Sequence, residues 1–256
     1  MEDDLSRKIM QNVQLATCLE PLAEKIYATT RTKDSTPKTK LEHFISSGIN
    51  FGWSFYDLSE RIKDKGYKQP EYIFDISLRA QNEALRFRSG GKVVFGHCIF
   101  FPLIITSQLV NKTYEPEEIL YGVKDVLKKT SKEDVNFFRE VLKKNFSLSS
   151  KKQEVPSFEK YQNMFELTLD NMNNPKKTGL YHTFHEQLTG FPITLDIFNY
   201  LSKSEEKILK SSSKIWEKYI NLEGTPPTNT FVGVLADLFV VAYYLLFTKF
   251  PEKEFF

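Results

Sequence analysis

Residues 231–247 form a nearly continuous apolar run in which Asp237 is the only charged side chain. Such a segment must be covered by lipid or by the rest of the chain, because its surface gains free energy by leaving water. The run is shorter than the roughly 20 residues that a bilayer crossing needs, and a carboxylate inside a membrane is costly. We therefore interpret it as a buried helix and expect no membrane partner.

Helical periodicity recurs along the rest of the chain. Val135, Phe138 and Leu142 are spaced as on one face of a helix, and Ser131 with Asp134 form a capping pair before them. Thr39 with Glu42 predicts a similar start, and Pro116 predicts a first-turn proline. Further helices are expected over about 5–28, 71–88, 94–110, 157–172, 180–201 and 203–221.

Evidence for strands is weak, and the joins between these helices are short. The apolar run around residues 93–110 lacks alternation and contains Pro102, which favours a buried helix with a proline bend over a strand. We predict an all-α fold, with residues 1–256 forming a single multi-helix bundle and the C-terminal helix buried at its centre.

Charge and cysteine content restrict the partners and the compartment. The formal net charge is +2, which gives no reason to expect nucleic acid as a partner. Cys18 and Cys98 are far apart in the sequence, so neither a disulfide framework nor a cysteine zinc site is expected. The acidic N-terminus lacks the features of a secretory signal. We expect a cytoplasmic protein.

The densest polar cluster is Tyr181-His-Thr-Phe-His-Glu186. On a helix, His182 and His185 project from one face, and Glu186 adds a carboxylate. His185 and Glu186 are therefore candidate metal ligands or an acid–base pair. The other interpretation is two interfacial histidines on an amphipathic helix.

Three further residues lie in unusual surroundings. His97 stands inside an apolar stretch, where a buried imidazole needs a partner and is a candidate ligand contact. Lys92 ends a Ser-Gly-Gly-Lys segment that resembles a phosphate-binding loop, although the spacing of a P-loop is absent. Asp237 must be paired, lie at a helix terminus or face a cavity, so functional and structural roles are both open.

Several segments together resemble the triphosphoribosyl-dephospho-CoA synthase family, whose members are all-α. Leu19-Glu20 and Ala23-Glu-Lys25 are similar to the family's early Leu-Glu-x-x-Ala-Pro-Lys-Pro-Gly segment, followed by Glu42-His-Phe44. Gly96 through Pro102-Leu103 resembles its Asn-x-Asn-Leu-Gly helix, and residues 130–141 resemble the helix before its glycine turn. Gly233 with Ala236-Asp-Leu238 looks like the closing Asn-Pro-Gly-x-x-Ala-Asp-Leu helix.

The departures from the family pattern fall on polar and glycine positions. Its Pro-Gly becomes Ile26-Tyr27, its asparagines fall on Lys92 and Val94, its glycine turn falls on residues 147–149, and its late Asn-Pro becomes Phe231-Val232. A core tolerates hydrophobic exchange, whereas phosphate binding needs glycines and specific donors. These losses should spare the fold and weaken the site.

The resemblance implies a transferase that joins the triphosphoribosyl part of ATP to dephospho-CoA, with activity altered or lost by the departures. It implies ATP or a related nucleotide and a dephospho-CoA-like molecule as partners, with Mg²⁺ as cofactor. Glu20 and Asp237 would be catalytic, and Lys25, Gly96 and Gly233 would bind nucleotide; Lys92 and His97 are added from the residue patterns alone. The alternatives are a non-catalytic helical scaffold that binds nucleotide or protein and, last, a metal-dependent hydrolase built on His182 and His185.

Overall fold

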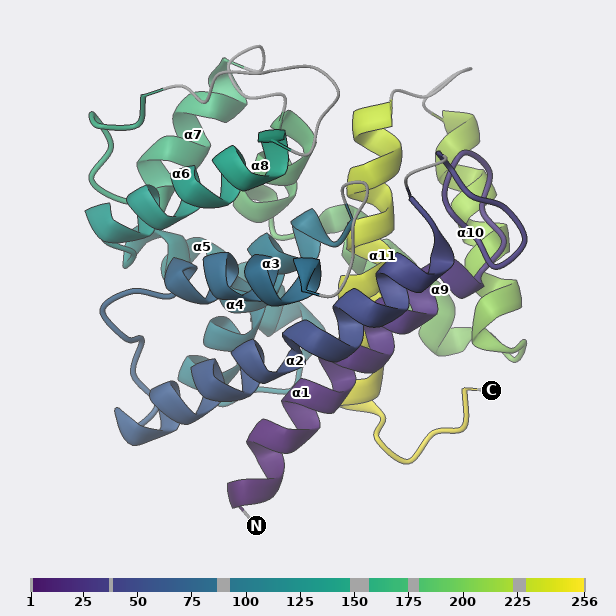
Figure 1. Ribbon diagram of the computed structural model, residues 1–256. Helices are drawn as coiled ribbons and strands as arrows, with labels where there is room; N and C mark the ends of the chain where they lie inside the picture. Colours follow the sequence, from purple (N-terminus) through teal and green to yellow (C-terminus); the bar gives the residue numbers. More distant parts are fainter. Residues whose placement is uncertain are drawn as a thin grey trace.

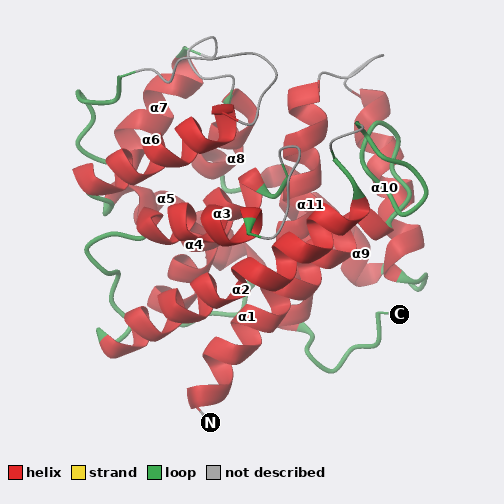
Figure 2. Ribbon diagram, in the orientation of Figure 1, coloured by secondary structure: helices red, strands yellow, loops and turns green. Residues whose placement is uncertain are grey.

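The computed structural model describes residues 2–36, 39–86, 93–147, 157–174, 180–222 and 229–255. Within these ranges the chain forms eleven α-helices and one 3-10 turn, and it contains no strand (Figures 1 and 2). The predicted all-α multi-helix class is confirmed. The elements are α1 (Glu2–Leu19), η1 (Glu20–Leu22), α2 (Leu41–Asp64), α3 (Phe74–Leu85), α4 (Phe95–Asn111), α5 (Pro116–Lys128), α6 (Lys132–Ser147), α7 (Met164–Asn173), α8 (Tyr181–Thr189), α9 (Pro192–Lys203), α10 (Ile208–Leu222) and α11 (Asn229–Lys249).

Helices α4 and α11 are the two most apolar elements and pack against each other in the core. Phe101 of α4 meets Tyr244 of α11 edge to face, and the Tyr244 hydroxyl donates to Gln108 Oε1 at 2.5 Å. Helices α1, α4, α8 and α9 all contact α11. This buried tyrosine hydroxyl thus has a hydrogen-bond partner, as burial of a polar group requires.

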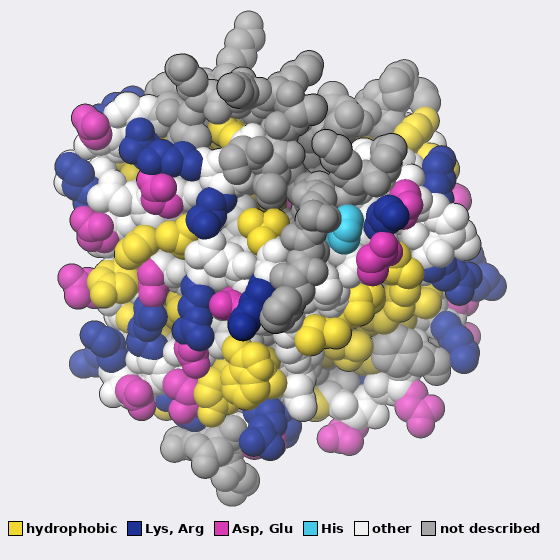
Figure 3. Space-filling view, viewed as in Figure 1, with side chains coloured by type: hydrophobic (Ala, Val, Ile, Leu, Met, Phe, Trp, Pro, Cys, Tyr) yellow, Lys and Arg dark blue, Asp and Glu magenta, His cyan; other side chains and the backbone are white. Residues whose placement is uncertain are grey.

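The segment Thr230–Lys249 is the one described helix long and apolar enough to cross a membrane, and 78% of its apolar window is buried by protein. This degree of burial fits the expected core helix. On the face seen in Figure 3, acidic and basic side chains are interspersed over the surface.

Two helix starts follow their sequence signals. Asp134 Oδ2 accepts the backbone N–H of Ser131, and the Ser131 hydroxyl accepts the N–H of Asp134, so the predicted capping pair is confirmed. Pro116 occupies the first turn of α5, as expected. Asp134 does more than predicted, because its Oδ1 accepts the N–H groups of Ile73 and Phe74 at the start of α3.

Other boundaries differ from the sequence predictions. The expected helix 180–201 is two helices, because Gly190 and Phe191 both adopt positive φ and Pro192 opens a new helix. The expected helix 5–28 ends at Leu19 and continues only as the 3-10 turn that contains Pro21. Helix α2 begins after Lys40 rather than after Thr39.

Candidate functional site

Glu20 and Lys25 form a buried ion pair next to the end of α1. Glu20 lies in η1, and the chain then turns so that Lys25 Nζ donates to both the carboxylate and the backbone carbonyl of Glu20, the latter at 2.5 Å. Both side chains are almost completely excluded from water. Burial lowers the pKa of Lys25, and the negative charge of Glu20 opposes that change.

Trp216 of α10 fixes this segment from the other side. Its indole N–H donates to the carbonyl of Ile26 at 3.1 Å, and Lys25 Nζ lies 5.2 Å from the centre of the indole ring. The ring therefore adds a cation–π contact to the ion pair while it holds the backbone next to Lys25. Trp216 itself is completely buried.

His97 and Asp237 form a second pair, which joins α4 to α11. His97 Nε2 lies 3.1 Å from Asp237 Oδ1, and His97 Nδ1 lies 3.5 Å from the hydroxyl of Thr17 on α1. His97 is 2% exposed, whereas the Asp237 side chain is 17% exposed. The inner end of this pair is thus sealed in protein and its carboxylate end reaches the surface.

Gly96 provides the space that Asp237 occupies. A Cβ at position 96 would lie 2.0 Å from Asp237 Oδ2 and 2.8 Å from Asp237 Cβ, so no larger residue fits there without displacing the carboxylate. Gly96 is buried. The close approach explains physically why a glycine stands at this point of an otherwise apolar helix.

The two pairs belong to one electrostatic cluster. Asp237 is close enough to Lys25 that its negative charge also opposes the lowering of the lysine pKa. Glu20, Lys25, Gly96, His97 and Asp237, five of the predicted site residues, therefore come together from η1 and its following loop, α4 and α11. Lys25 offsets the charge of Glu20, so the partly exposed carboxylate of Asp237 is the group of this cluster that can accept a proton at the surface end.

Gly233 lies one helical turn before Asp237 on α11, on the same side of the helix. It is exposed, and a Cβ there would meet no atom within 4 Å. The side of α11 next to Asp237 therefore has open space beside it among the described residues. Lys92, the remaining predicted nucleotide contact, lies outside the described residues.

The predicted metal residues His185 and Glu186 occupy a different part of the fold. Glu186 is 2% exposed, and its carboxylate accepts the N–H groups of Ile193 and Thr194 at the start of α9. Burial raises the pKa of Glu186 to about 7. The His185 ring packs 5.8 Å from that of Tyr181. Within the described ranges, no three His, Cys, Asp or Glu side chains are grouped as a metal site.

Two contacts of the cluster were not singled out from the sequence. Thr17 lies on α1 and Trp216 on α10, and neither stands in a recognisable motif. The one available signal was the scarcity of tryptophan, which occurs twice in the chain.

No family model, curated protein or solved structure matches the chain.

Proposed function

We propose that the chain is a transferase-like nucleotide-binding protein whose ligand site is centred on Asp237. The observation that supports this most is the meeting of Glu20, Lys25, Gly96 and Asp237 in one cluster. These four residues were selected by resemblance to the triphosphoribosyl-dephospho-CoA synthase family, from three separate segments.

In the proposed reaction the ribose 2′-hydroxyl oxygen of a dephospho-CoA-like molecule forms a bond to C1′ of the ribose of ATP. The bond between C1′ and N9 breaks and adenine leaves, while the hydroxyl proton passes to a base. Asp237 suits this role because His97 holds one carboxylate oxygen and the side chain reaches the surface. Glu20 acts at a distance, by holding Lys25 charged beside Asp237.

The residues present fit a magnesium ion bound together with a nucleotide. Magnesium in such sites is held by one or two carboxylates plus substrate phosphates, and Asp237 supplies one partly exposed carboxylate, whereas the Glu20 carboxylate is buried and paired with Lys25. When bound, the ion would neutralise charge on the triphosphate. The chain's own contribution is to place the Asp237 carboxylate and to keep its inner side dry.

A second function, a helical scaffold that binds without catalysis, is favoured by the state of Lys25. Its ammonium is fully buried and already engaged by the carboxylate and the carbonyl of Glu20. A lysine in this state does not reach a phosphate unless the segment moves. The transferase and the scaffold would therefore use the same residues to bind a ligand. They differ in whether a reaction follows binding.

Isothermal titration calorimetry with ATP–magnesium and with dephospho-CoA tests the proposal on the full chain. We expect heat from both ligands, and loss of the ATP–magnesium signal in Asp237→Asn. Asp125→Asn, an exposed carboxylate on α5, is the matched control and should bind as the wild type does. Silence from both ligands, with helical circular dichroism intact, overturns the nucleotide-binding proposal.

Adenine release then separates the transferase from the scaffold. Incubation of the chain with both ligands and magnesium, followed by chromatography, should show adenine and a product of matching mass. Binding of both ligands without adenine release would favour the scaffold. The Asp237→Asn variant serves as the blank for slow chemical breakdown of ATP.

A further inference from the structure

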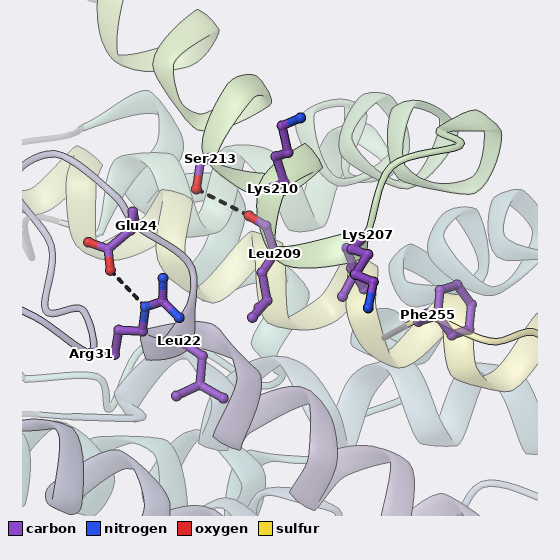
Figure 4. A pocket seen from close by; sticks show the side chains of 9 residues that line it. Leu22, Glu24, Arg31, Lys207, Leu209, Lys210, Ser213 and Phe255 are labelled. Carbon is purple, nitrogen blue, oxygen red and sulfur yellow. Dashed lines mark hydrogen bonds and ion pairs between the residues drawn. The ribbon is translucent and has the colours of Figure 1, made fainter.

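A cavity separate from the Asp237 cluster lies beside the segment that follows α1. It has a volume of about 470 Å³, within the range of small-molecule sites, and it is formed by the segment after α1, the start of α10 and the C-terminal tail (Figure 4). Its lining residues are Leu22, Glu24, Arg31, Lys207, Ile208, Leu209, Lys210, Ser213 and Phe255. None of these takes part in the Asp237 cluster.

The walls of this cavity are mostly apolar. Leu22 and Leu209 line the cavity from its two sides, Leu209 extends from α10 toward the segment after α1, and Phe255 lies at one end (Figure 4). Phe255 is nearly buried and packs edge to face on Phe247, while its carbonyl accepts the N–H of Ile208. The C-terminal tail is therefore fixed against α10, and the cavity wall that it forms is a defined one.

The charges at the rim are predominantly positive. Arg31 is engaged by Glu24, whose other oxygen accepts the hydroxyl of Thr32. Lys210 pairs with Glu206 and points away from the cavity in Figure 4. Lys207, by contrast, has no acidic partner within ion-pair distance among the described residues and is exposed at the mouth. One cation is thus left available beside an apolar interior.

We propose that this cavity binds a medium-chain acyl carboxylate, with the carboxylate at Lys207 and the chain against Leu22 and Leu209. The apolar walls favour a ligand body that leaves water, and the single available ammonium selects one negative charge at the mouth. A cationic or neutral amphiphile of the same length lacks that pairing. This inference concerns a site separate from the nucleotide site and does not depend on it.

Calorimetric titration of the full chain with hexanoate, octanoate and decanoate tests this assignment. Affinity should rise about four-fold with each methylene group that enters the cavity. Heptyltrimethylammonium, which has the alkyl chain of octanoate and the opposite charge, should bind at least ten-fold more weakly than octanoate. Equal binding of the anion and the cation, or no dependence on chain length, overturns the proposal.

Two charge-reversed variants locate the head group. Lys207→Glu should weaken octanoate binding about ten-fold, whereas Lys124→Glu, which changes an exposed lysine on α5 by the same charge, should leave it unchanged. Equal losses in both variants would indicate a long-range charge effect and overturn the site. The proposal is also overturned if no carboxylate gives heat while circular dichroism shows that the chain is helical. This outcome does not depend on the result with ATP.

Discussion

His97 Nε2 lies 3.1 Å from Asp237 Oδ1, and this contact links α4 to α11 at the point where the apolar core meets the surface. A neutral imidazole that donates from Nε2 leaves Nδ1 as an acceptor, and Thr17 on α1 places its hydroxyl 3.5 Å from Nδ1. Three helices therefore fix one carboxylate. The orientation of Asp237 therefore depends on neighbours that are themselves buried.

Gly96→Ala should displace Asp237 from this position. The added methyl would lie 2.0 Å from Asp237 Oδ2, and the short aspartate side chain cannot move away while it keeps its contact with His97. We expect a loss of about 1–3 kcal/mol in the free energy of unfolding, which is typical of overpacking. The variant should also lose the ATP–magnesium binding that we propose at Asp237. Urea denaturation and calorimetry measure the two effects.

Gly233→Ala is the matched control for that substitution. It adds the same methyl group to the neighbouring helix, one turn from Asp237, where no atom lies within 4 Å. Because alanine is favoured over glycine inside a helix by about 0.5–1 kcal/mol, this variant should be as stable as the wild type or more stable. A Gly96→Ala protein as stable as Gly233→Ala would contradict the packing seen at Gly96.

Lys25→Met should destabilise the chain far more than the loss of a surface ion pair. It leaves the Glu20 carboxylate buried without its cation, a change that typically costs about 3–5 kcal/mol. Thermal unfolding should shift by roughly 2–4 °C for each kcal/mol in a chain of this size. Glu20→Leu combined with Lys25→Met removes both charges and should recover much of that loss.

The exposed pair of Lys218 and Asp196 provides the comparison. Its side chains are about half exposed, so Lys218→Met should cost less than about 1 kcal/mol. If the Lys25 and Lys218 variants unfolded at the same temperature, Glu20 and Lys25 would have to be solvated in the folded protein.

Asp134→Ala should weaken the starts of two helices at once. Its carboxylate accepts the N–H groups of Ile73 and Phe74 at the start of α3 and that of Ser131 just before α6. Each cap contributes about 0.5–2 kcal/mol, so the variant should lose about 1–4 kcal/mol in urea denaturation. Ser131→Ala removes only the hydroxyl that accepts the N–H of Asp134 and keeps the Ser131 N–H bond to Asp134, so it should lose less than Asp134→Ala does. Equal losses would mean that the contacts to α3 contribute nothing.

The local sequence predicted those parts of the fold that local rules determine. Ser131 with Asp134 and Pro116 marked helix starts because capping depends on residues a few positions apart. The break at Gly190 was missed because the apolar pattern continues across it, and the positive φ of Phe191 is set by packing and not by its own preference.

The sequence drew attention to some residues of the cluster and did not predict their pairings. Asp237 and His97 were noticeable because each is a polar residue in an apolar run, and both needed a partner. That each supplies the partner for the other depends on how α4 and α11 cross, which no spacing in the sequence records. Thr17 and Trp216 complete the cluster from other helices, so only the fold identifies them.

Glu186 should make the stability of the folded chain depend on pH. Its carboxylate is buried and bonds the N–H groups of Ile193 and Thr194, but its Oε2 has no hydrogen-bond partner among the described residues. Burial raises its pKa from 4.5 to about 7 in the folded chain. Between those values the folded state binds more protons than the unfolded state, so stability falls as the pH rises through this interval.

Glu186→Gln should remove that dependence. The amide oxygen still accepts the N–H groups at the start of α9, and no charge forms in the core when the pH rises. At about 1.4 kcal/mol per pKa unit, the wild type should lose at most roughly 3 kcal/mol between pH 4.5 and pH 8 from this group. Urea denaturation across that range should show the variant to be more stable than the wild type at pH 8 and not at pH 5.

Glu217→Gln, which neutralises an exposed carboxylate on α10, should follow the wild-type profile. Parallel profiles for the wild type and Glu186→Gln would mean that Glu186 is solvated, and the burial argument for its raised pKa would fail.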